Sequence, residues 1–467
     1  MKNMTIINER ELNEECGIFG VFGVHDASVL TYYGLHALQH RGQEGCGIVR
    51  VNNRAFKRIK GEGLITEVFN EKNLVTLDGD MAIGHVRYSD ERNAGIENIQ
   101  PFIFMHQTGD FALAHNGSLI NSVQLKKYLE DKGSLFHSTS DSEILAHLIK
   151  KESNDRDRLF SIIDALNMME GAFAFLIMTA SKIYAIRDKH GLKPLSLGQF
   201  NGGYVVSSET CAFDVVGAKF IRDVEPGEIV VIDKDGITSV DYSKFKRHNM
   251  CAMEYIYFAR PDSDIEGKNV HSFRKETGRL LYQNAPVDAD IVIGVPDSSL
   301  SAAVGYSEES GIPYEMGLIK NKYIGRTFIQ PSQKLREKGV RMKLSAVRTI
   351  VNGKRVALID DSIVRGTTVQ RIVARLKEAG AKEVHLRIAS PPMQYPCYYG
   401  VEPSVDEELI YSRLSKNIEN VRDYMGVDSL AYLPVESLYK AGNRDELCTA
   451  CFTGKYPTPL YQIQSHR

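Results

Sequence analysis

The sequence lacks any long apolar run, and this absence excludes several classes of protein. The first fifteen residues, MKNMTIINERELNEE, contain no apolar stretch of the length that a signal peptide needs, and no later segment approaches the roughly 18 apolar residues of a membrane span. An excess of one charge is also missing, because 57 Lys and Arg residues nearly balance 59 Asp and Glu residues. Such a chain is expected to bind neither nucleic acid nor a membrane, and any phosphate site must be local. We therefore expect a cytoplasmic protein.

Cysteines are few and scattered. An odd number of them, seven in 467 residues, argues against a disulfide framework and favours ligand or nucleophile roles for some of them. The sequence also contains no internal repeat and no low-complexity tract. The cysteines are Cys16, Cys46, Cys211, Cys251, Cys397, Cys448 and Cys451.

The length predicts two domains, because single cores usually stop growing at roughly 250 to 300 residues. As far as about residue 235, short apolar runs such as MAIGHVRY and FAFLIMTA alternate with helical stretches, which indicates an α+β domain of sheets covered by helices. From about residue 288, apolar strands such as KRVALIDD end in polar turns and alternate with amphipathic helices, which is typical of a parallel α/β sheet. We expect a first domain over residues 16–240 and a second over residues 241–467.

Cys16 stands in EECGIFGVFG, where glycines leave room for a substrate to approach the thiol. A buried structural cysteine is the alternative, since unpaired cysteines are often buried. If residues 1–15 are removed as a propeptide, Cys16 carries a free α-amine with a pKa of about 8, which can act as the base for its own thiol. The sequence therefore offers a candidate nucleophile at this junction.

Six ordered segments strengthen the nucleophile interpretation: CGIFG, RGQEGCG, GHVRYS, HNG, STSDSE and RDKHGLKPL. Together they resemble the class II, or N-terminal-nucleophile, glutamine amidotransferase family, whose fold is an αββα sandwich. The resemblance implies that Cys16 is the nucleophile, that Arg87 and Asp141 bind glutamine, and that Asn116 and Gly117 form the oxyanion hole. A guanidinium suits the glutamine carboxylate, a carboxylate suits its ammonium group, and amide N–H groups suit a developing oxyanion.

A second site is indicated by VALIDDSIVRGTT at residues 356–368, an apolar strand followed by two carboxylates and a small-residue loop that leads into a helix. Such a loop presents N–H groups and hydroxyls to a phosphate, and the helix dipole adds to the attraction. An ordinary polar turn or a generic nucleotide-binding turn is the alternative. The segment resembles the type I phosphoribosyltransferase family, which implies a site for phosphoribosyl pyrophosphate (PRPP). The residues implied are Asp360, Asp361, Ser362, Arg365, Gly366, Thr367 and Thr368.

Two further segments complete the implied PRPP site. IGVPDSS resembles the pyrophosphate loop of the same family, with Ser298 near a Mg²⁺ ion that Asp360 and Asp361 also hold. The basic segment of residues 320–344 is expected to form a mobile lid in which Arg326 and Lys343 neutralise pyrophosphate. A solvated basic loop is the alternative, as for most charge runs.

Cys448 and Cys451 form a CTAC motif, and Cys251 and Cys397 stand alone. Four thiolates can hold zinc or a 4Fe-4S cluster, and four unrelated core cysteines are a further alternative. MCAMEYIYFARPDS and CTACFTGKYPT resemble the branch of PRPP-dependent glutamine amidotransferases that contains an iron-sulfur cluster. This resemblance implies a 4Fe-4S cluster on these four cysteines, and a propeptide that ends in acidic residues, as NEE does here.

The combined resemblance implies an enzyme that hydrolyses glutamine at Cys16 and delivers the ammonia to PRPP, which yields 5-phosphoribosylamine for purine synthesis. It further implies a homotetramer that purine nucleotides inhibit. An internal ammonia path is expected, with Tyr323, Phe328 and Ile329 as lining or as plain core. Two alternatives are a class II amidotransferase with another acceptor and an iron-sulfur regulator that binds PRPP or nucleotides.

Overall fold

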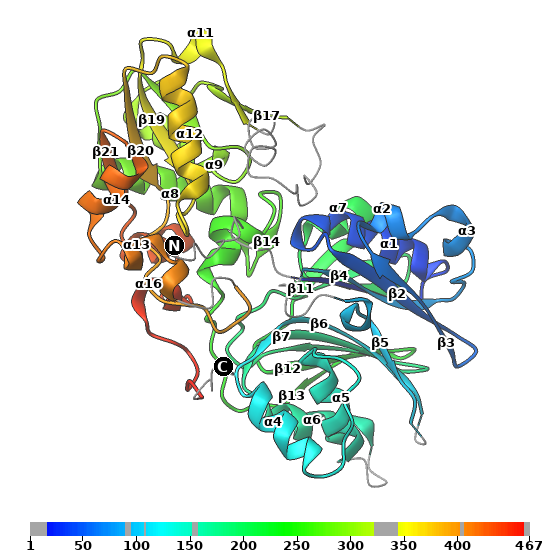
Figure 1. Cartoon of the computed structure of the whole chain (residues 1–467). Coiled ribbons are helices and arrows are strands. Elements are labelled where there is room, and N and C mark those ends of the chain that lie inside the picture. The colour runs from blue at the N-terminus through cyan, green and yellow to red at the C-terminus, as the bar shows by residue number, and fades with distance from the viewer. Residues whose placement is uncertain are drawn as a thin grey trace, which may run out of the picture.

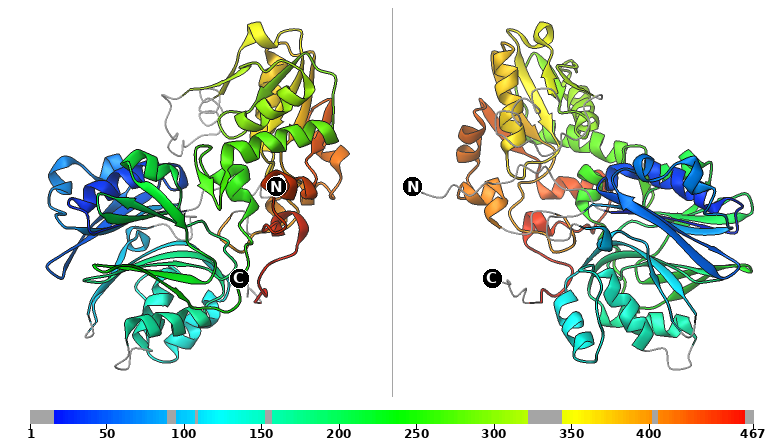
Figure 2. Two further views of the ribbon diagram at one scale, coloured as in Figure 1. Left: turned by 180° about the vertical axis from the view of Figure 1, so that it is seen from behind. Right: turned by 45° about the vertical axis from the view of Figure 1, so that its right-hand side comes forward.

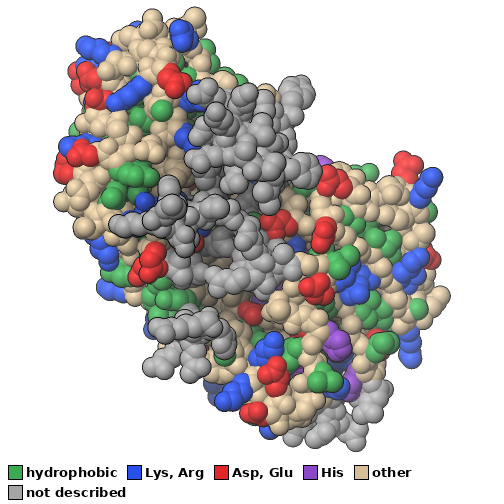
Figure 3. Space-filling view, in the orientation of Figure 1, with side chains coloured by type: hydrophobic (Ala, Val, Ile, Leu, Met, Phe, Trp, Pro, Cys, Tyr) green, Lys and Arg blue, Asp and Glu red, His purple; other side chains and the backbone are tan. Residues whose placement is uncertain are grey.

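The computed structural model describes residues 16–88, 95–106, 109–151, 157–321, 344–401 and 406–461. The first half of the chain forms two stacked sheets with helices outside them, and the later part forms a separate layered unit beside this sandwich (Figure 1; Figure 2). Figure 3 shows Lys and Arg interspersed with Asp and Glu on the described part of one face, in keeping with the balanced charge. In the described part of the chain, no helix is both long and apolar enough to cross a membrane.

The first sheet has seven antiparallel strands in the order β11-β9-β10-β1-β4-β2-β3. Helix α1 (Ala27–Ala37) and helix α7 (Cys211–Val216) pack on its outer face around Phe19 and Phe213, and the short helices α2 (Ile65–Val68) and α3 (Glu71–Leu74) lie nearby. The strands are β1 (Gly17–Phe22), β2 (Gly45–Asn52), β3 (Ala55–Glu62), β4 (Met81–Arg87), β9 (Ser196–Phe200), β10 (Gly203–Ser207) and β11 (Lys219–Asp223).

The second sheet has six antiparallel strands in the order β13-β12-β8-β7-β6-β5. Helices α4 (Ser122–Glu130), α5 (Ser142–Lys151) and α6 (Arg158–Met168) cover its outer face. The strands are β5 (Phe102–Phe104), β6 (Phe111–Leu119), β7 (Gly171–Met178), β8 (Ile183–Arg187), β12 (Glu228–Asp233) and β13 (Gly236–Asp241).

The inner faces of the two sheets share a core that includes Ile18 and Ile83 from the first sheet and Ala114, Ala174 and Leu176 from the second. Small alanines on β6 and β7 let the sheets approach closely, while alternating residues face the helices outside. The predicted αββα sandwich is confirmed.

The second unit contains a parallel sheet in the order β16-β19-β20-β21, formed by β16 (Ile291–Gly294), β19 (Arg355–Asp360), β20 (Glu383–Ile388) and β21 (Ser429–Tyr432). Ala357 and Ile359 face the core under α8 (Val270–Asn284) and α9 (Leu300–Ser310). Val356 and Leu358 face α12 (Thr367–Glu378) and α14 (Ile418–Met425) on the other side. Both faces of β19 are buried, which explains its unbroken apolar run and confirms the predicted parallel α/β unit.

Short elements connect these layers. They are η1 (Gln39–Arg41), η2 (Ile96–Asn98), the π-helix η3 (Glu254–Phe258), the hairpin strands β14 (Asp264–Ile265) and β15 (Lys268–Asn269), the hairpin strands β17 (Leu318–Lys320) and β18 (Leu344–Ala346), α11 (Arg348–Val351), η4 (Asp406–Glu408), α13 (Ile410–Arg413), α15 (Val435–Gly442) and α16 (Ala450–Thr453). Strand β13 ends at Asp241, next to the predicted boundary between residues 240 and 241, which stays a prediction.

Candidate functional site

The predicted nucleophile, Cys16, directly precedes β1 and is partly exposed. Its thiol donates to the Tyr88 carbonyl at 3.6 Å, and its own carbonyl accepts a hydrogen bond from Arg41 Nε at 3.1 Å. Gly17 pairs with Val86, so Cys16 and Arg87 lie one residue beyond this pair on neighbouring strands. The register therefore brings the predicted nucleophile beside the predicted carboxylate-binding arginine.

Two buried histidines join β4 of the first sheet to β6 of the second. The His85 Nε2 atom lies 3.1 Å from the His115 carbonyl, which can only accept, so this nitrogen carries a proton. Burial is the main cause that lowers the pKa of both rings to about 3, and the Arg87 charge adds to the effect on His85. Both rings are therefore neutral. Because Arg87 follows His85 by two residues and Asn116 follows His115 directly, this bond places the end of β4 next to the HNG segment.

Asn116 and Gly117 occupy the part of β6 that runs beside β7. Among the described residues, neither polar atom of the fully buried Asn116 side chain has a hydrogen-bond partner. Gly117 has φ of 140°, and a Cβ atom there would lie 2.0 Å from the Ala172 carbonyl oxygen, so only glycine fits. The segment thus presents an unsatisfied amide beside a position that excludes every side chain.

Asp141 approaches the end of the same strand from the start of α5. Its carboxylate accepts hydrogen bonds from Leu119 N at 2.8 Å and Ser118 Oγ at 3.5 Å. Burial nevertheless raises the pKa of Asp141 to about 6, so the group is mostly ionised at neutral pH. The structure brings together at one end of the sandwich Cys16, Arg87, Asn116, Gly117 and Asp141.

Three residues of this site were not assigned roles from the sequence: Arg41, His85 and His115. Each belongs to a motif that carried the resemblance, namely RGQEGCG, GHVRYS and HNG. Their contacts join segments that are far apart in the sequence, so the motif spacing showed only that the positions belong to a set.

The predicted PRPP loop lies at the carboxyl edge of the parallel sheet. Strands β16 and β19 pair in parallel up to Gly294 and Ile359, so the loops that follow them meet at this edge. Ser299 Oγ donates to Asp360 Oδ1 at 2.8 Å and contacts Asp361 Oδ2 at 3.3 Å. The two predicted loops are thus bonded to each other through the carboxylates.

Asp361 is buried, and this burial raises its pKa, although hydrogen bonds from Ser298 and Ser362 and the charge of Arg274 oppose the rise. Ser362 Oγ donates to Asp361 Oδ1 at 2.7 Å. Gly366, with φ of 81°, caps the N-terminus of α12, where Thr367 and Thr368 form the first turn. The loop therefore ends at a helix N-terminus suited to an anion.

Only some of the remaining predicted PRPP contacts lie among the described residues. The Arg365 guanidinium forms an ion pair with Glu408. Lys320, at the start of the predicted lid, donates to Asp297 Oδ2 at 2.9 Å, next to Ser298. Five predicted residues lie outside the described residues, namely Arg326, Lys343, Tyr323, Phe328 and Ile329.

The four cysteines of the second half lie in or against two core clusters: Cys251, Cys397 and Cys451 in one, and Cys397 and Cys448 in the other. Cys251 and Cys448 form a parallel bridge, and the Tyr395 N–H donates to the Cys451 carbonyl at 3.1 Å. Burial is the main cause that raises the pKa of the Cys448 thiol to about 12, and Cys397 contributes to the rise. Within the described ranges, however, no group of three or more His, Cys, Asp or Glu side chains is arranged to hold a metal ion. The iron-sulfur assignment stays a prediction.

Comparison with known proteins agrees with this architecture. Residues 88–215 match the family model described as a glutamine amidotransferase domain, and residues 274–390 match a phosphoribosyl transferase domain. Amidophosphoribosyltransferase of Bacillus subtilis (strain 168) is 55% identical over 462 residues, which cover 97% of this chain and 96% of the relative. Amidophosphoribosyltransferase of Staphylococcus aureus (strain Mu50) is 50% identical over 469 residues, which cover 99% of this chain and 94% of the relative.

Two solved structures match nearly the whole chain. One, described as the allosteric regulatory enzyme of purine biosynthesis, superposes with a TM-score of 0.92 at 55% identity and covers 96% of this chain and 97% of its own. The other, the glutamine PRPP amidotransferase from B. subtilis complexed with ADP and GMP, has a TM-score of 0.91 at 55% identity and covers 96% of this chain and 98% of its own. Identity at this level over nearly the full length shows that the chain belongs to the amidophosphoribosyltransferase family.

Proposed function

We propose that this chain converts PRPP, glutamine and water to 5-phosphoribosylamine, glutamate and pyrophosphate, the first step of purine synthesis. The observation that carries this proposal is the presence of both the glutaminase residues and the PRPP loop in one chain that is 55% identical over 97% of its length to an amidophosphoribosyltransferase. An amidotransferase with another acceptor would not need the PRPP loop. A regulator without activity would not need the glutaminase residues.

The glutaminase half starts with attack of the Cys16 thiolate on the glutamine carboxamide carbon. Arg87 binds the glutamine carboxylate through its guanidinium, and Asp141 binds the ammonium group. Ammonia leaves, a thioester forms on Cys16, and water then hydrolyses the thioester to release glutamate.

The Asn116 amide and the Gly117 N–H are proposed to stabilise the oxyanion that forms during both steps. The absence of a partner for the buried Asn116 amide in the described residues supports this role, because such a group otherwise costs about 1 to 3 kcal/mol. Removing one oxyanion donor typically costs about 2.7 to 4 kcal/mol of barrier.

The synthetic half joins the ammonia to the anomeric carbon of PRPP as pyrophosphate leaves. The loop of Ser362, Gly366, Thr367 and Thr368 binds the 5-phosphate at the start of α12, and Arg365 contributes positive charge nearby. Asp360 and Asp361 hold the ribose hydroxyls. We keep Arg326 and Lys343 as predicted pyrophosphate contacts.

The donor chemistry beside Ser298, Asp360 and Asp361 fits Mg²⁺, which prefers oxygen ligands and keeps several waters. When bound, the ion supplies positive charge to the pyrophosphate. The carboxylates contribute the oxygens, and Ser299 orients Asp360 through the bond at 2.8 Å.

Residues 1–15, which lie outside the described residues, are proposed to be a propeptide. Their removal leaves the Cys16 α-amine as the base for the thiol. Intact-mass measurement should give a chain that starts at Cys16, and full glutamine-dependent activity in protein that still carries Met1 would overturn this point.

We propose that Cys251, Cys397, Cys448 and Cys451 hold a 4Fe-4S cluster, with zinc as the alternative for the same thiolates. The packing of these cysteines supports this set, because Ala252 N donates to the Cys448 carbonyl at 3.1 Å and Cys397 packs against the core cluster that contains Cys448. The bound group would tie residues 250–252 to the C-terminal segment. An absorption spectrum and iron content of protein purified without oxygen distinguish iron from zinc.

Purine nucleotides are proposed as inhibitors, because the solved relative from B. subtilis is complexed with ADP and GMP. A homotetramer and a cytoplasmic location are proposed on the resemblance to the same family.

The direct test measures pyrophosphate and phosphoribosylamine formation from PRPP and Mg²⁺ with glutamine, and separately with ammonia. Purified wild-type protein should form product from either nitrogen source, and Cys16→Ala should use ammonia alone. No PRPP-dependent pyrophosphate release with either nitrogen source would overturn the proposed function.

A further inference from the structure

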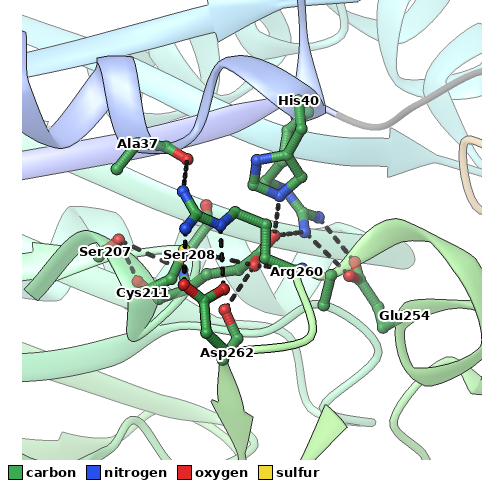
Figure 4. Close-up of polar contacts among 12 residues, drawn as sticks. Ala37, His40, Ser207, Ser208, Cys211, Glu254, Arg260 and Asp262 are labelled. Carbon is green, nitrogen blue, oxygen red and sulfur yellow. Dashed lines mark hydrogen bonds and ion pairs between the residues drawn. The ribbon is translucent and has the colours of Figure 1, made fainter. Parts of the chain in front are cut away.

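A buried ionic network lies where the nucleophile's strand meets the second half of the chain. The Arg41 side chain is fully buried and donates to Glu209 Oε1 at 2.7 Å, and to Glu254 at 2.7 and 2.9 Å as a two-pronged pair. Its remaining Nε–H donates to the Cys16 carbonyl at 3.1 Å. Figure 4 shows His40 and Glu254 reaching this network from opposite sides, with the Arg260 side chain beside it paired to Asp262 and the Ala37 carbonyl. We call Arg41, Glu209 and Glu254 the Arg41 bridge.

The Glu209 end of the bridge is fastened to the nucleophile's own strand. Ser208 Oγ accepts from Ile18 N at 3.0 Å, and Ser208 N donates to the Ile18 carbonyl at 3.1 Å. Burial would raise the pKa of Glu209, but His40, Arg41 and Ser263 outweigh this effect and hold it well below the usual range. Glu209 is therefore a permanent negative charge against Arg41.

Glu254 reaches the bridge from the second half of the chain, 213 residues after Arg41. It opens the π-helix η3, where Arg274 Nε donates to Tyr255 O at 2.7 Å. Arg274 Nη2 donates to the carbonyl of Ala259, the residue that follows η3, at 2.7 Å. Hydrogen bonds thus connect Arg274 on α8 to the main chain of Cys16, by way of the η3 segment, Glu254 and Arg41.

Stability alone gives a weak reason for burying these charges. Buried ion pairs often contribute no more than apolar residues of the same volume, because desolvation offsets the attraction. What a two-pronged arginine pair does supply is a fixed direction, since the planar guanidinium must lie in the plane of the carboxylate. Glu254 binds both terminal nitrogens of Arg41, and Glu209 binds one of them. The guanidinium therefore has a fixed position from which its Nε–H can bind the Cys16 carbonyl.

We propose that Glu254 is a positioning residue for the nucleophile, supplied by the second half of the chain: through Arg41 it fixes the main chain of Cys16. This inference rests on the proposed function. It makes the glutamine site depend on the unit that contains the predicted PRPP loop, through the Arg41–Glu254 contact and not through the predicted lid. The glutaminase site is therefore incomplete without the second unit.

The test compares Glu254→Gln with the matched control Glu266→Gln in the full chain. Glu266 forms a similar mostly buried pair with Arg187, at 2.5 Å, and with Arg444, and it is not bonded to the Cys16 segment. Each variant is assayed for glutamine-dependent synthesis, ammonia-dependent synthesis at saturating PRPP, and iron content. Ammonia-dependent synthesis bypasses Cys16, so a positioning role must affect only the glutamine-dependent rate.

For Glu254→Gln we expect kcat/KM for glutamine to fall about 10- to 100-fold, with ammonia-dependent synthesis and iron content unchanged, because small displacements of reacting groups can cost about 100-fold. Arg41→Lys keeps the positive charge but cannot bind Glu254 through two nitrogens, so it should also lose glutamine-dependent synthesis while it keeps ammonia-dependent synthesis. Glu266→Gln should leave the ratio of the two rates unchanged.

An unchanged glutamine rate in Glu254→Gln, an equal loss of both rates, or the same selective loss in Glu266→Gln would overturn the inference. Failure of the wild type to use either nitrogen source would instead overturn the proposed function.

Discussion

Replacing Asn116 by alanine should separate catalysis from stability. The side chain is fully buried, and in the described structure neither its amide nitrogen nor its oxygen is hydrogen-bonded. If it donates to the oxyanion, Asn116→Ala removes about 2.7 to 4 kcal/mol of transition-state stabilisation, which lowers kcat for glutamine about 100- to 1,000-fold. Its removal also relieves an unsatisfied buried group that costs about 1 to 3 kcal/mol, so the free energy of unfolding should not fall.

The control is Asn121→Ala, which removes a buried asparagine with partners. Asn121 Nδ2 donates to Met168 O at 2.9 Å, and its Oδ1 accepts from Glu170 N at 3.0 Å. Its loss leaves both partners without this hydrogen bond and should lower the free energy of unfolding by about 1 to 3 kcal/mol, with little change in kcat.

The assays are glutamine hydrolysis with PRPP present, ammonia-dependent synthesis and denaturant unfolding. Asn116→Ala should lower only the rate of glutamine hydrolysis. A loss of kcat smaller than about tenfold would refute the oxyanion role. An Asn116→Ala protein less stable than Asn121→Ala would show instead that the buried amide supports the fold.

Three other predictions concern Asp141, Asp361 and Cys448. Because burial raises the pKa of Asp141 to about 6, its charge is present above this pH and lost below it, so kcat/KM for glutamine should fall about tenfold per pH unit below pH 6. Ammonia-dependent synthesis, expressed per concentration of free NH₃, should not show this fall. A glutamine profile flat between pH 5 and 7 would contradict the role. Asp361→Asn should raise KM for PRPP about 10- to 100-fold with either nitrogen source, since it removes one charged hydrogen-bonding group, and an unchanged KM would exclude contact with PRPP. Cys448→Ser should lose iron and unfold more easily. The control is Cys46→Ser, which changes a buried cysteine of β2 and should keep its iron. Equal iron content in both variants would refute the ligand set.

Much of the fold was predictable because its signals are local. The apolar run of β19 with carboxylates at its end indicates a doubly covered parallel strand, and the structure buries both faces of that strand. The motif residues Cys16, Arg87 and Asn116 were also predicted from the chain, because each belongs to an ordered set whose chemistry suits glutamine, and their roles stay predictions.

Tertiary structure decided what depends on distant segments meeting. The proton on His85 Nε2 follows from a carbonyl on a strand of the other sheet, and the raised pKa of Asp141 follows from burial. The contact between Arg41 and Glu254 joins residues 213 positions apart. Periodicity shows which face of a strand or helix is buried, but it carries no information on which buried groups will face each other. The sequence alone therefore determined the residues available for chemistry, and the packing of the two units decided which of them meet.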